Sequence, residues 1–327
     1  MGSEAKITYS EIRTWKECRY KHHLGYQQRL TSLVPKTYFR LGDFVHRYID
    51  AMYKEMRGSQ SQHLPTVTLD DLMKRLDAEW TALSKQPNQF ESEEDAKIDL
   101  AIIRGMVLGY HDHVFSKEQF EGVVTEREVQ CEIGGVVFGG KIDGLVKMDG
   151  KYWTMEHKTA SSFSETDRRL LFIDDQTTHY LVLVSELFPG KQFIGSIRNI
   201  LKKPSIKQTK KETLDEYCRR VVDDYRSRPE HYFVRILVTR TPEEIAAYRE
   251  YLQTVTAEMA RDVVFKAPTR YCGMCEFMEY CTEPVADIKA NILMSQFRIR
   301  GQRHQELAPV FVSPNSSVNQ TERSVVQ

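Results

Sequence analysis

The chain has 327 residues, of which 41 % are hydrophobic and 10 % aromatic, so it can bury a sizeable core and is unlike a disordered polymer. Its formal net charge is zero, which excludes a strongly basic protein but not local basic patches. No apolar run approaches the roughly 20 residues of a membrane helix, and the N-terminus lacks the apolar region of a signal peptide. We therefore expect one elaborated domain or two closely packed ones, in the cytoplasm and without a membrane partner.

The first third of the chain is patterned for helices. Between Leu41 and Met52 the apolar residues recur at the spacing of one helix face, and a breaker-containing stretch at 85–90 separates two later segments. The predicted helices cover residues 9–29, 37–57, 69–85 and 94–118. We expect a helical N-terminal region over residues 1–120.

From Gly122 onward the helical period gives way to strand-like alternation. Strands are predicted over residues 123–133, 136–148, 151–159, 193–201 and 234–239, and helices over 165–187, 210–226 and 242–264. This order predicts an α/β fold, a small mixed sheet flanked by helices, with its core over residues 121–265 and a helical wrapper. The polar, Ser/Asn/Gln-rich end predicts a mobile tail over residues 285–327.

The dipeptide Asp-Gly at 149–150 separates two strand-like runs and predicts a β-hairpin with a two-residue type I′ turn. A turn of this length places Met148 opposite Lys151 and so determines every further pair. The register predicts that Asp143 lies directly opposite Glu156, with their Cβ atoms about 5 Å apart.

The two faces of this hairpin differ in chemistry. Strand alternation gathers apolar side chains on one face, namely Ile142, Val146, Met148, Trp153 and Met155. On the polar face the register opposes Asp143 to Glu156 and Lys141 to Lys158, although like charges directly opposite destabilise a sheet. A divalent cation between the two acids would explain this, and oxygen ligands suit Mg²⁺ or Mn²⁺. A half-buried hairpin with a solvated polar face is the alternative.

The pattern Asp143…Glu156-His157-Lys158 resembles the PD-(D/E)XK nuclease superfamily. Gln176 and Tyr180 fit the Q-x3-Y element of its RecB-like branch, and Leu41-Gly42-Asp43-Phe44-Val45-His46 fits the upstream helix of that branch. The resemblance implies a restriction-endonuclease-like core. It also implies that Asp143, Glu156, His46 and the backbone carbonyl of His157 bind Mg²⁺ or Mn²⁺, and that Asp143, Glu156 and Lys158 are catalytic.

Further residues follow from the same resemblance. Glu126 lies where the family often carries another acid, although Glu128 shares its strand face. Gln176 and Tyr180 would position DNA, but they could also be a surface pair one helical turn apart. A run of lysines without an acid would follow the phosphate backbone: Lys202, Lys203, Lys207, Lys210 and Lys211. Likewise, His46 could be an ordinary core histidine.

Four of the six cysteines form a further pattern. Cys18 together with Cys272-x2-Cys275-x5-Cys281 is similar to the four-cysteine iron–sulfur site of AddB-type and CRISPR-associated RecB-like nucleases. The resemblance implies a [4Fe–4S] cluster that joins the two ends of the chain, with residues 266–284 packed against the first helix. Zinc also accepts four cysteines, so both metals remain candidates.

The resemblance implies a DNA exonuclease that processes DNA ends in recombination, replication or repair in a bacterial or phage-infected cell. A phage origin is compatible with it. No G-x4-G-K-[ST] sequence occurs, so we expect a separate helicase or annealing protein as partner. Three alternatives remain: a catalytically silent DNA-binding or scaffolding subunit, a structural zinc protein with incidental hairpin acids, and a structure-specific endonuclease.

Overall fold

The computed structural model describes residues 6–33, 37–57, 67–86, 89–301 and 303–304. Its centre is a six-stranded mixed sheet in which the strand order is β1-β4-β5-β6-β7, with β3 paired to β4. The strands are β1 (Lys6–Thr8), β3 (Gly122–Ile133), β4 (Val136–Met148), β5 (Lys151–Ala160), β6 (Phe193–Lys202) and β7 (Phe233–Thr239). The predicted α/β class with a small mixed sheet flanked by helices is confirmed.

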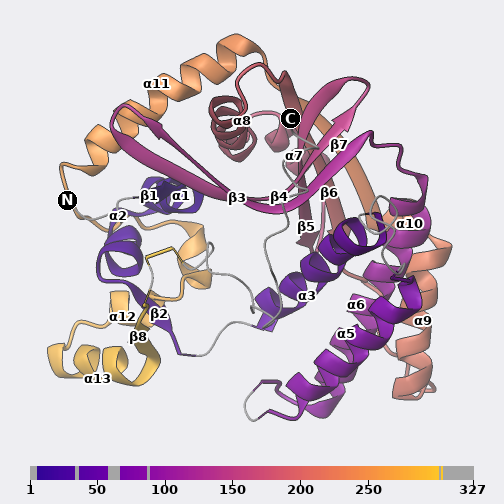
Figure 1. Ribbon diagram of the computed structural model, residues 1–327. Coiled ribbons are helices and arrows are strands. Elements are labelled where there is room, and N and C mark those ends of the chain that lie inside the picture. Colours follow the sequence, from indigo (N-terminus) through magenta and orange to yellow (C-terminus); the bar gives the residue numbers. More distant parts are fainter. Residues whose placement is uncertain (1–5, 34–36, 58–66, 87–88, 302, 305–327) are drawn as a thin grey trace.

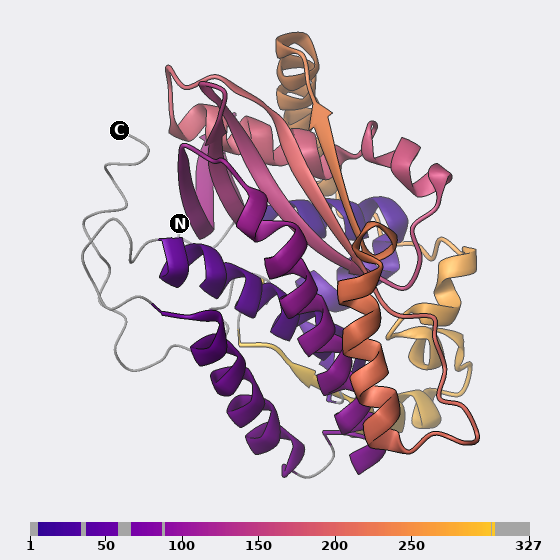
Figure 2. The same cartoon turned by 90° about the vertical axis from the view of Figure 1, so that its right-hand side faces the viewer.

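Two helical layers enclose this sheet, with α8 and α11 above the long β3–β4 hairpin and α3, α5, α6 and α9 below it (Figure 1). Figure 2 shows α6 and α9 side by side. The lower helices are α3 (Thr37–Ala51), α5 (Leu69–Ser84), α6 (Glu93–His113) and α9 (Leu214–Ser227). The short helices η2 (Met52–Arg57), η3 (Phe115–Lys117) and α10 (Pro229–Tyr232) extend this layer. None of the helices in the described ranges is long and apolar enough to cross a membrane.

Side-chain caps explain where several helices begin. Thr213 accepts a hydrogen bond from the N–H of Glu216 and starts α9 at Leu214, four residues later than predicted. Thr241 caps α11 (Pro242–Met259) in the same way, with proline at the first helical position. This helix ends five residues before its predicted end. Ser92 caps α6.

The chain crosses from β5 to β6 through α7 (Glu165–Leu171) and α8 (Asp175–Leu187). Because a helix fills the connection, β6 returns parallel to β5. Glu156 on β5 thereby becomes the register partner of Arg198 on β6. Sequence periodicity predicts the helical crossover but not the register that sets Glu156 beside Arg198.

The predicted hairpin register is confirmed close to the turn. Backbone φ values of 51° and 72° at Asp149 and Gly150 place both residues in the left-handed region of the predicted turn type. Pairing runs from Met148–Lys151 to Gly144–Met155 and ends there within the described sheet. Asp143 and Glu156 are the next residues on the two separating strands.

The predicted opposition of Lys141 and Lys158 is wrong. Lys141 pairs across to Glu128 on β3, whereas Lys158 pairs with Ile200 on β6. The two strands separate because β5 follows β6 after Met155, and the same edge of β4 instead pairs with β1 at residues 137–139.

The alternative of a solvated polar face does not hold at Thr154 and Glu156. Thr154 and Glu156 are buried, and helix α8 packs over this part of the sheet. Gly140 permits the close approach, since a Cβ atom there would lie 2.6 Å from the Tyr180 ring. Ile142, predicted to share a face with Val146, packs instead in the apolar cluster that includes helices α1 (Tyr9–Glu17), α8 and α11.

The two ends of the chain form a small unit of their own (Figure 1, lower left). The predicted helix 9–29 is interrupted at Cys18, and strand β2 pairs with β8. Its elements are α2 (Arg19–His22), η1 (His23–Gln27), β2 (Leu30–Ser32), η4 (Arg270–Met274), α12 (Met278–Thr282), α13 (Ala286–Gln296) and β8 (Phe297–Ile299). Residues 286–299, expected to begin a mobile tail, therefore form a helix and a strand, whereas residues 305–327 lie outside the described residues.

Candidate active site

Asp143 lies where β4 and β5 separate, beside two residues that the sequence pattern also selected. Its Oδ2 atom accepts the backbone N–H of His157 at 2.7 Å and lies 3.6 Å from Nδ1 of His46 on α3. Burial disfavours the charged carboxylate, but His46 and His157 outweigh this effect and lower the pKa of Asp143 to about 2. The fold thus brings Asp143, His46 and His157 together.

Glu156 is the second acid of the site and is only 7 % exposed. Its Oε1 atom is buried and has no hydrogen-bond partner among the described residues. Burial raises the pKa of Glu156 well above its ordinary value, and the negative charge of Asp143 raises it further, while Arg198 acts in the opposite direction. A half-buried and a buried carboxylate on neighbouring strands, with one unpartnered oxygen, suit a bound cation.

Lys158 follows two residues later on the same face of β5. Its side chain still reaches solvent. Partial desolvation and the positive charge of Arg13 nevertheless lower the pKa of Lys158. An ammonium group therefore stands beside the carboxylate pair without an ion-pair partner among the described residues.

The ring of His157 points into a buried polar network that sequence reasoning missed. Arg235 donates from Nε to Asn199 Oδ1 at 2.6 Å, which leaves the Asn199 amide nitrogen 3.3 Å from His157 Nδ1. Burial lowers the pKa of His157 to about 3, so the ring is neutral and Nδ1 accepts this hydrogen bond. No spacing pattern in the sequence links these three residues.

Gln176 and Tyr180 lie on the face of α8 that covers the carboxylates. The Gln176 Nε2 atom lies 3.5 Å from the Tyr180 hydroxyl. Burial raises the pKa of Tyr180, and the charge of Glu156 raises it further, which places the phenol next to that acid. The two residues are therefore not an exposed surface pair, because Tyr180 is buried.

Arg198 on β6 completes this side of the site and was not predicted. Its guanidinium donates to Asp174 Oδ2 at 2.6 Å and to Thr177 Oγ1 at 2.8 Å. The sequence held one signal for it, because a single arginine interrupts the otherwise uncharged strand from Phe193 to Leu201.

The described residues contain no group of three or more His, Cys, Asp and Glu side chains arranged to hold a metal ion. The donor chemistry of the site nevertheless fits a hard divalent cation, because the Asp143 carboxylate lies beside His46 and Oε1 of Glu156, the acid on the neighbouring strand, lacks a partner among the described residues. The predicted additional acid, Glu126, lies on β3, but its side chain is outside the described part of the chain.

The four selected cysteines lie in the unit formed by the chain ends. Cys18 separates α1 from α2, Cys272 lies in η4, Cys275 follows it and Cys281 lies in α12. All are half-buried and free of disulfides. Burial raises the pKa of Cys275, which packs against the small apolar cluster that includes Leu24 and Phe277. Soft thiols from both chain ends fit the ligand chemistry of zinc or an iron–sulfur cluster.

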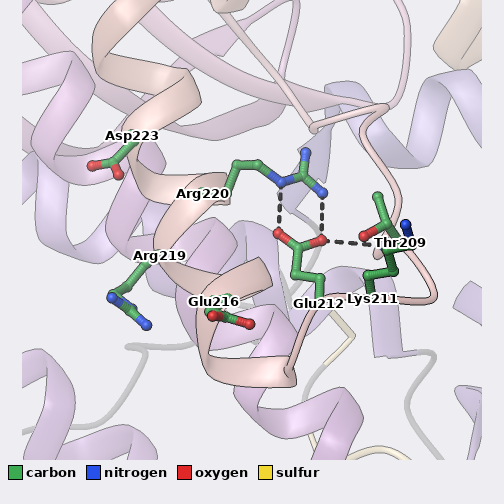
Figure 3. A pocket seen from close by; sticks show the side chains of 7 residues that line it. All are labelled: Thr209, Lys211, Glu212, Glu216, Arg219, Arg220 and Asp223. Carbon is green, nitrogen blue, oxygen red and sulfur yellow. Dashed lines mark hydrogen bonds and ion pairs between the residues drawn. The ribbon is translucent and has the colours of Figure 1, made fainter.

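The five lysines of the predicted DNA track fall into two sets. Lys202 pairs with Ala160, and the N–H of Lys203 donates to the Ala160 carbonyl, so both lie just beyond Lys158. Lys207, Lys210 and Lys211 are exposed in the following loop. There the hollow in Figure 3 combines basic and acidic side chains: Thr209, Lys211, Glu212, Glu216, Arg219, Arg220 and Asp223. The acids Glu212, Glu216 and Asp223 therefore lie around Lys211.

Three comparisons relate the chain to known proteins. A family model described as the PD-(D/E)XK nuclease superfamily matches residues 6–282. No curated protein matches significantly. A solved structure titled "Crystal structure of SSO0001" is 15% identical to this chain, with a TM-score of 0.32, and the match covers 76% of this chain and 97% of that chain. Because the family model spans most of the sequence, the chain belongs to the PD-(D/E)XK nuclease superfamily, whose members hydrolyse phosphodiester bonds with metal ions.

Proposed function

We propose that this chain is a Mg²⁺- or Mn²⁺-dependent DNA exonuclease that processes DNA ends in recombination, replication or repair. The observation that carries the proposal is the half-buried Asp143 beside the buried Glu156, with one oxygen of Glu156 unpartnered among the described residues and Lys158 on the same strand as Glu156. Membership of the nuclease superfamily supplies the reaction class.

Each residue of the site has a distinct role in this proposal. Asp143, Glu156, His46 and the backbone carbonyl of His157 hold the metal. A divalent cation, when bound, neutralises charge at the scissile phosphate and makes water more acidic. The Lys158 ammonium orients the attacking water and stabilises the negative charge that develops on the phosphate.

The bound strand approaches Asp143 and Glu156 from the solvent side, next to the start of α8, where the half-buried Gln176 positions it and the buried Tyr180 supports Gln176. Lys202 and Lys203 contact its phosphates, because they stand just beyond Lys158 at the end of β6. Lys207, Lys210 and Lys211 extend this contact less strongly, since acids lie among them. A separate helicase or annealing protein supplies the DNA ends.

The test is digestion of end-labelled single- and double-stranded DNA, linear and circular, with Mg²⁺, Mn²⁺ or a chelator. We expect linear DNA to be shortened from its ends with either metal and to be untouched with the chelator. Lys158→Ala should abolish cleavage, whereas Lys151→Ala, an exposed lysine at the turn end of the same strand, should leave it unchanged. Cleavage of circular DNA would make the enzyme an endonuclease, and no cleavage with either metal would favour a silent DNA-binding subunit.

We further propose that Cys18, Cys272, Cys275 and Cys281 bind a [4Fe–4S] cluster, with zinc as the alternative. Support comes from the free, half-buried thiols and from the position of Cys275 in an apolar cluster with Leu24, which follows Cys18 in the chain by six residues. A metal or cluster bound by four cysteine thiolates stabilises the fold by linking the two ends of the chain.

Metal content of protein purified without oxygen tests this proposal directly. A brown solution with iron and sulfide indicates the cluster, and a colourless solution with one zinc per chain indicates the alternative. Cys275→Ser should lose the metal, whereas Cys131→Ser, a half-buried cysteine outside the set, should keep it. A colourless wild type without zinc would contradict both forms.

A further inference from the structure

Arg198 is only 5 % exposed, which is unusual for a side chain that carries a permanent charge. It lies beside Glu156 in the parallel β5–β6 register. Its partners belong to α8 and to the residue that caps that helix: Asp174 and Thr177. The guanidinium is therefore fixed between the sheet and α8 by short hydrogen bonds.

A third partner of Arg198 determines how Gln176 is oriented. Arg198 Nη1 lies 3.3 Å from Gln176 Oε1. Because a guanidinium has only donors, the carbonyl oxygen of the amide must face Arg198. The Gln176 Nε2 atom then faces the Tyr180 hydroxyl, 3.5 Å away, on the side where Tyr180 meets Glu156.

We propose that Arg198 is a positioning residue that holds the Gln176 amide so that one N–H faces Tyr180 and the other is presented to the phosphate of a bound DNA strand. This inference rests on the proposed function, because the phosphate belongs to the substrate proposed above. Phosphate oxygens only accept hydrogen bonds, so the amide must present its nitrogen to them. A flipped amide would present its carbonyl oxygen to an anion.

Arg240 provides a matched control for this role. It is also buried, at 9 % exposure, and it also joins the sheet to the start of α8. It donates to Thr178 Oγ1 at 2.8 Å and to the Asp174 carbonyl at 3.1 Å. Its hydrogen bonds to described residues go to Thr178 and to backbone carbonyls and not to Gln176, so loss of Arg240 disturbs the helix start without removing the hydrogen bond to the amide.

The experiment measures the dissociation constant of a fluorescent DNA duplex in Ca²⁺, so that binding is read without cleavage. We expect Arg198→Lys and Gln176→Ala each to weaken binding about tenfold, the scale of one hydrogen bond to a charged group. The double variant should bind no more weakly than Gln176→Ala alone. Arg240→Lys should add its own effect, if any, to that of Gln176→Ala.

Additive effects of Arg198→Lys and Gln176→Ala would overturn the inference. If Arg198→Lys does not fold, Gln176→Glu replaces it, because the new carboxylate keeps one oxygen on Arg198 and presents the other to the DNA. It should bind DNA more weakly than Gln176→Ala while its melting temperature is unchanged or higher, and equal or tighter binding contradicts the inference. Cleavage by the wild type is measured separately, so a failed nuclease assay and a failed binding cycle are distinguishable outcomes.

Discussion

Two glutamates, Glu11 in α1 and Glu156 in β5, are 0 % and 7 % exposed, but their surroundings differ. Glu11 accepts hydrogen bonds from His22 Nε2 at 2.9 Å and from Arg303 Nη2, and His304 lies nearby. Oε1 of Glu156 and Oε2 of Glu11 both lack a hydrogen-bond partner among the described residues. The two acids differ in their cations, because His22 and Arg303 contact Glu11 directly, whereas Arg198, which lies beside Glu156, donates to α8 and its capping residue instead.

The pKa of Glu11 is lowered and that of Glu156 is raised, because the charges beside the two buried acids differ in sign. Burial opposes ionisation of both, but His22 and Arg303 outweigh it and lower the pKa of Glu11. At Glu156 the charge of Asp143 adds to burial and raises the pKa. A buried acid with internal partners stabilises the fold, whereas a buried acid without them is suited to bind a cation from solution.

The largest effect that tests this comparison is on activity. Glu156→Gln should reduce DNA cleavage roughly a thousandfold or more, since it removes a charge that the site uses in the transition state. Its unfolding midpoint in urea should be unchanged or higher, because a neutral amide is easier to bury than an unpaired carboxylate. Substantial cleavage by purified Glu156→Gln would show that this acid is not part of the site.

Glu11→Gln should lower the stability of the fold, whereas Glu156→Gln should lower DNA cleavage. It leaves the charged Arg303 without its carboxylate and should lower the free energy of unfolding by about 3 kcal/mol, measured by urea denaturation. Glu17→Gln on the same helix is the control, because the exposed ion pairs of Glu17 with Arg13 and Lys21 should contribute at most about 1 kcal/mol. Equal losses in the two variants would mean that the buried contacts of Glu11 are not special.

Metal addition should separate the two acids directly. Mg²⁺ at about 100 times its dissociation constant should raise the free energy of unfolding by about 2.7 kcal/mol, because it binds only the folded chain. We expect this gain to be lost in Glu156→Gln and kept in Glu17→Gln. A gain that persists in Glu156→Gln would place the stabilising metal at another site.

The smallest effect is on the pH dependence of stability. The folded-state pKa of Glu11 lies below its ordinary value of 4.5, so its contribution is present above that pH and is lost as the pH falls through the folded-state pKa. One such group changes the free energy of unfolding by at most about 1.4 kcal/mol per pH unit. Urea denaturation at a series of acidic pH values should show this loss of stability in the wild type and not in Glu11→Gln. A constant difference between the two curves would contradict it.

Much of the site was predictable because it is local in sequence. The turn at 149–150 determined the hairpin register, and that register placed Asp143 and Glu156 on adjacent strands. Arg198 was not predicted, although it stands next to Glu156, because the parallel pairing of β6 depends on a crossover through α8. Glu11 was missed for a similar reason, since Arg303 lies almost at the other end of the described chain.

The sequence by itself determined the order of the elements, the hairpin turn and the candidate residues, because periodicity and turn chemistry act over a few neighbouring residues. Only the tertiary structure decided which carboxylates are buried, which cations reach them and where the strands separate. Burial and charge pairing depend on segments that are distant in the chain. The same residue type therefore became a structural contact at Glu11 and a candidate metal ligand at Glu156.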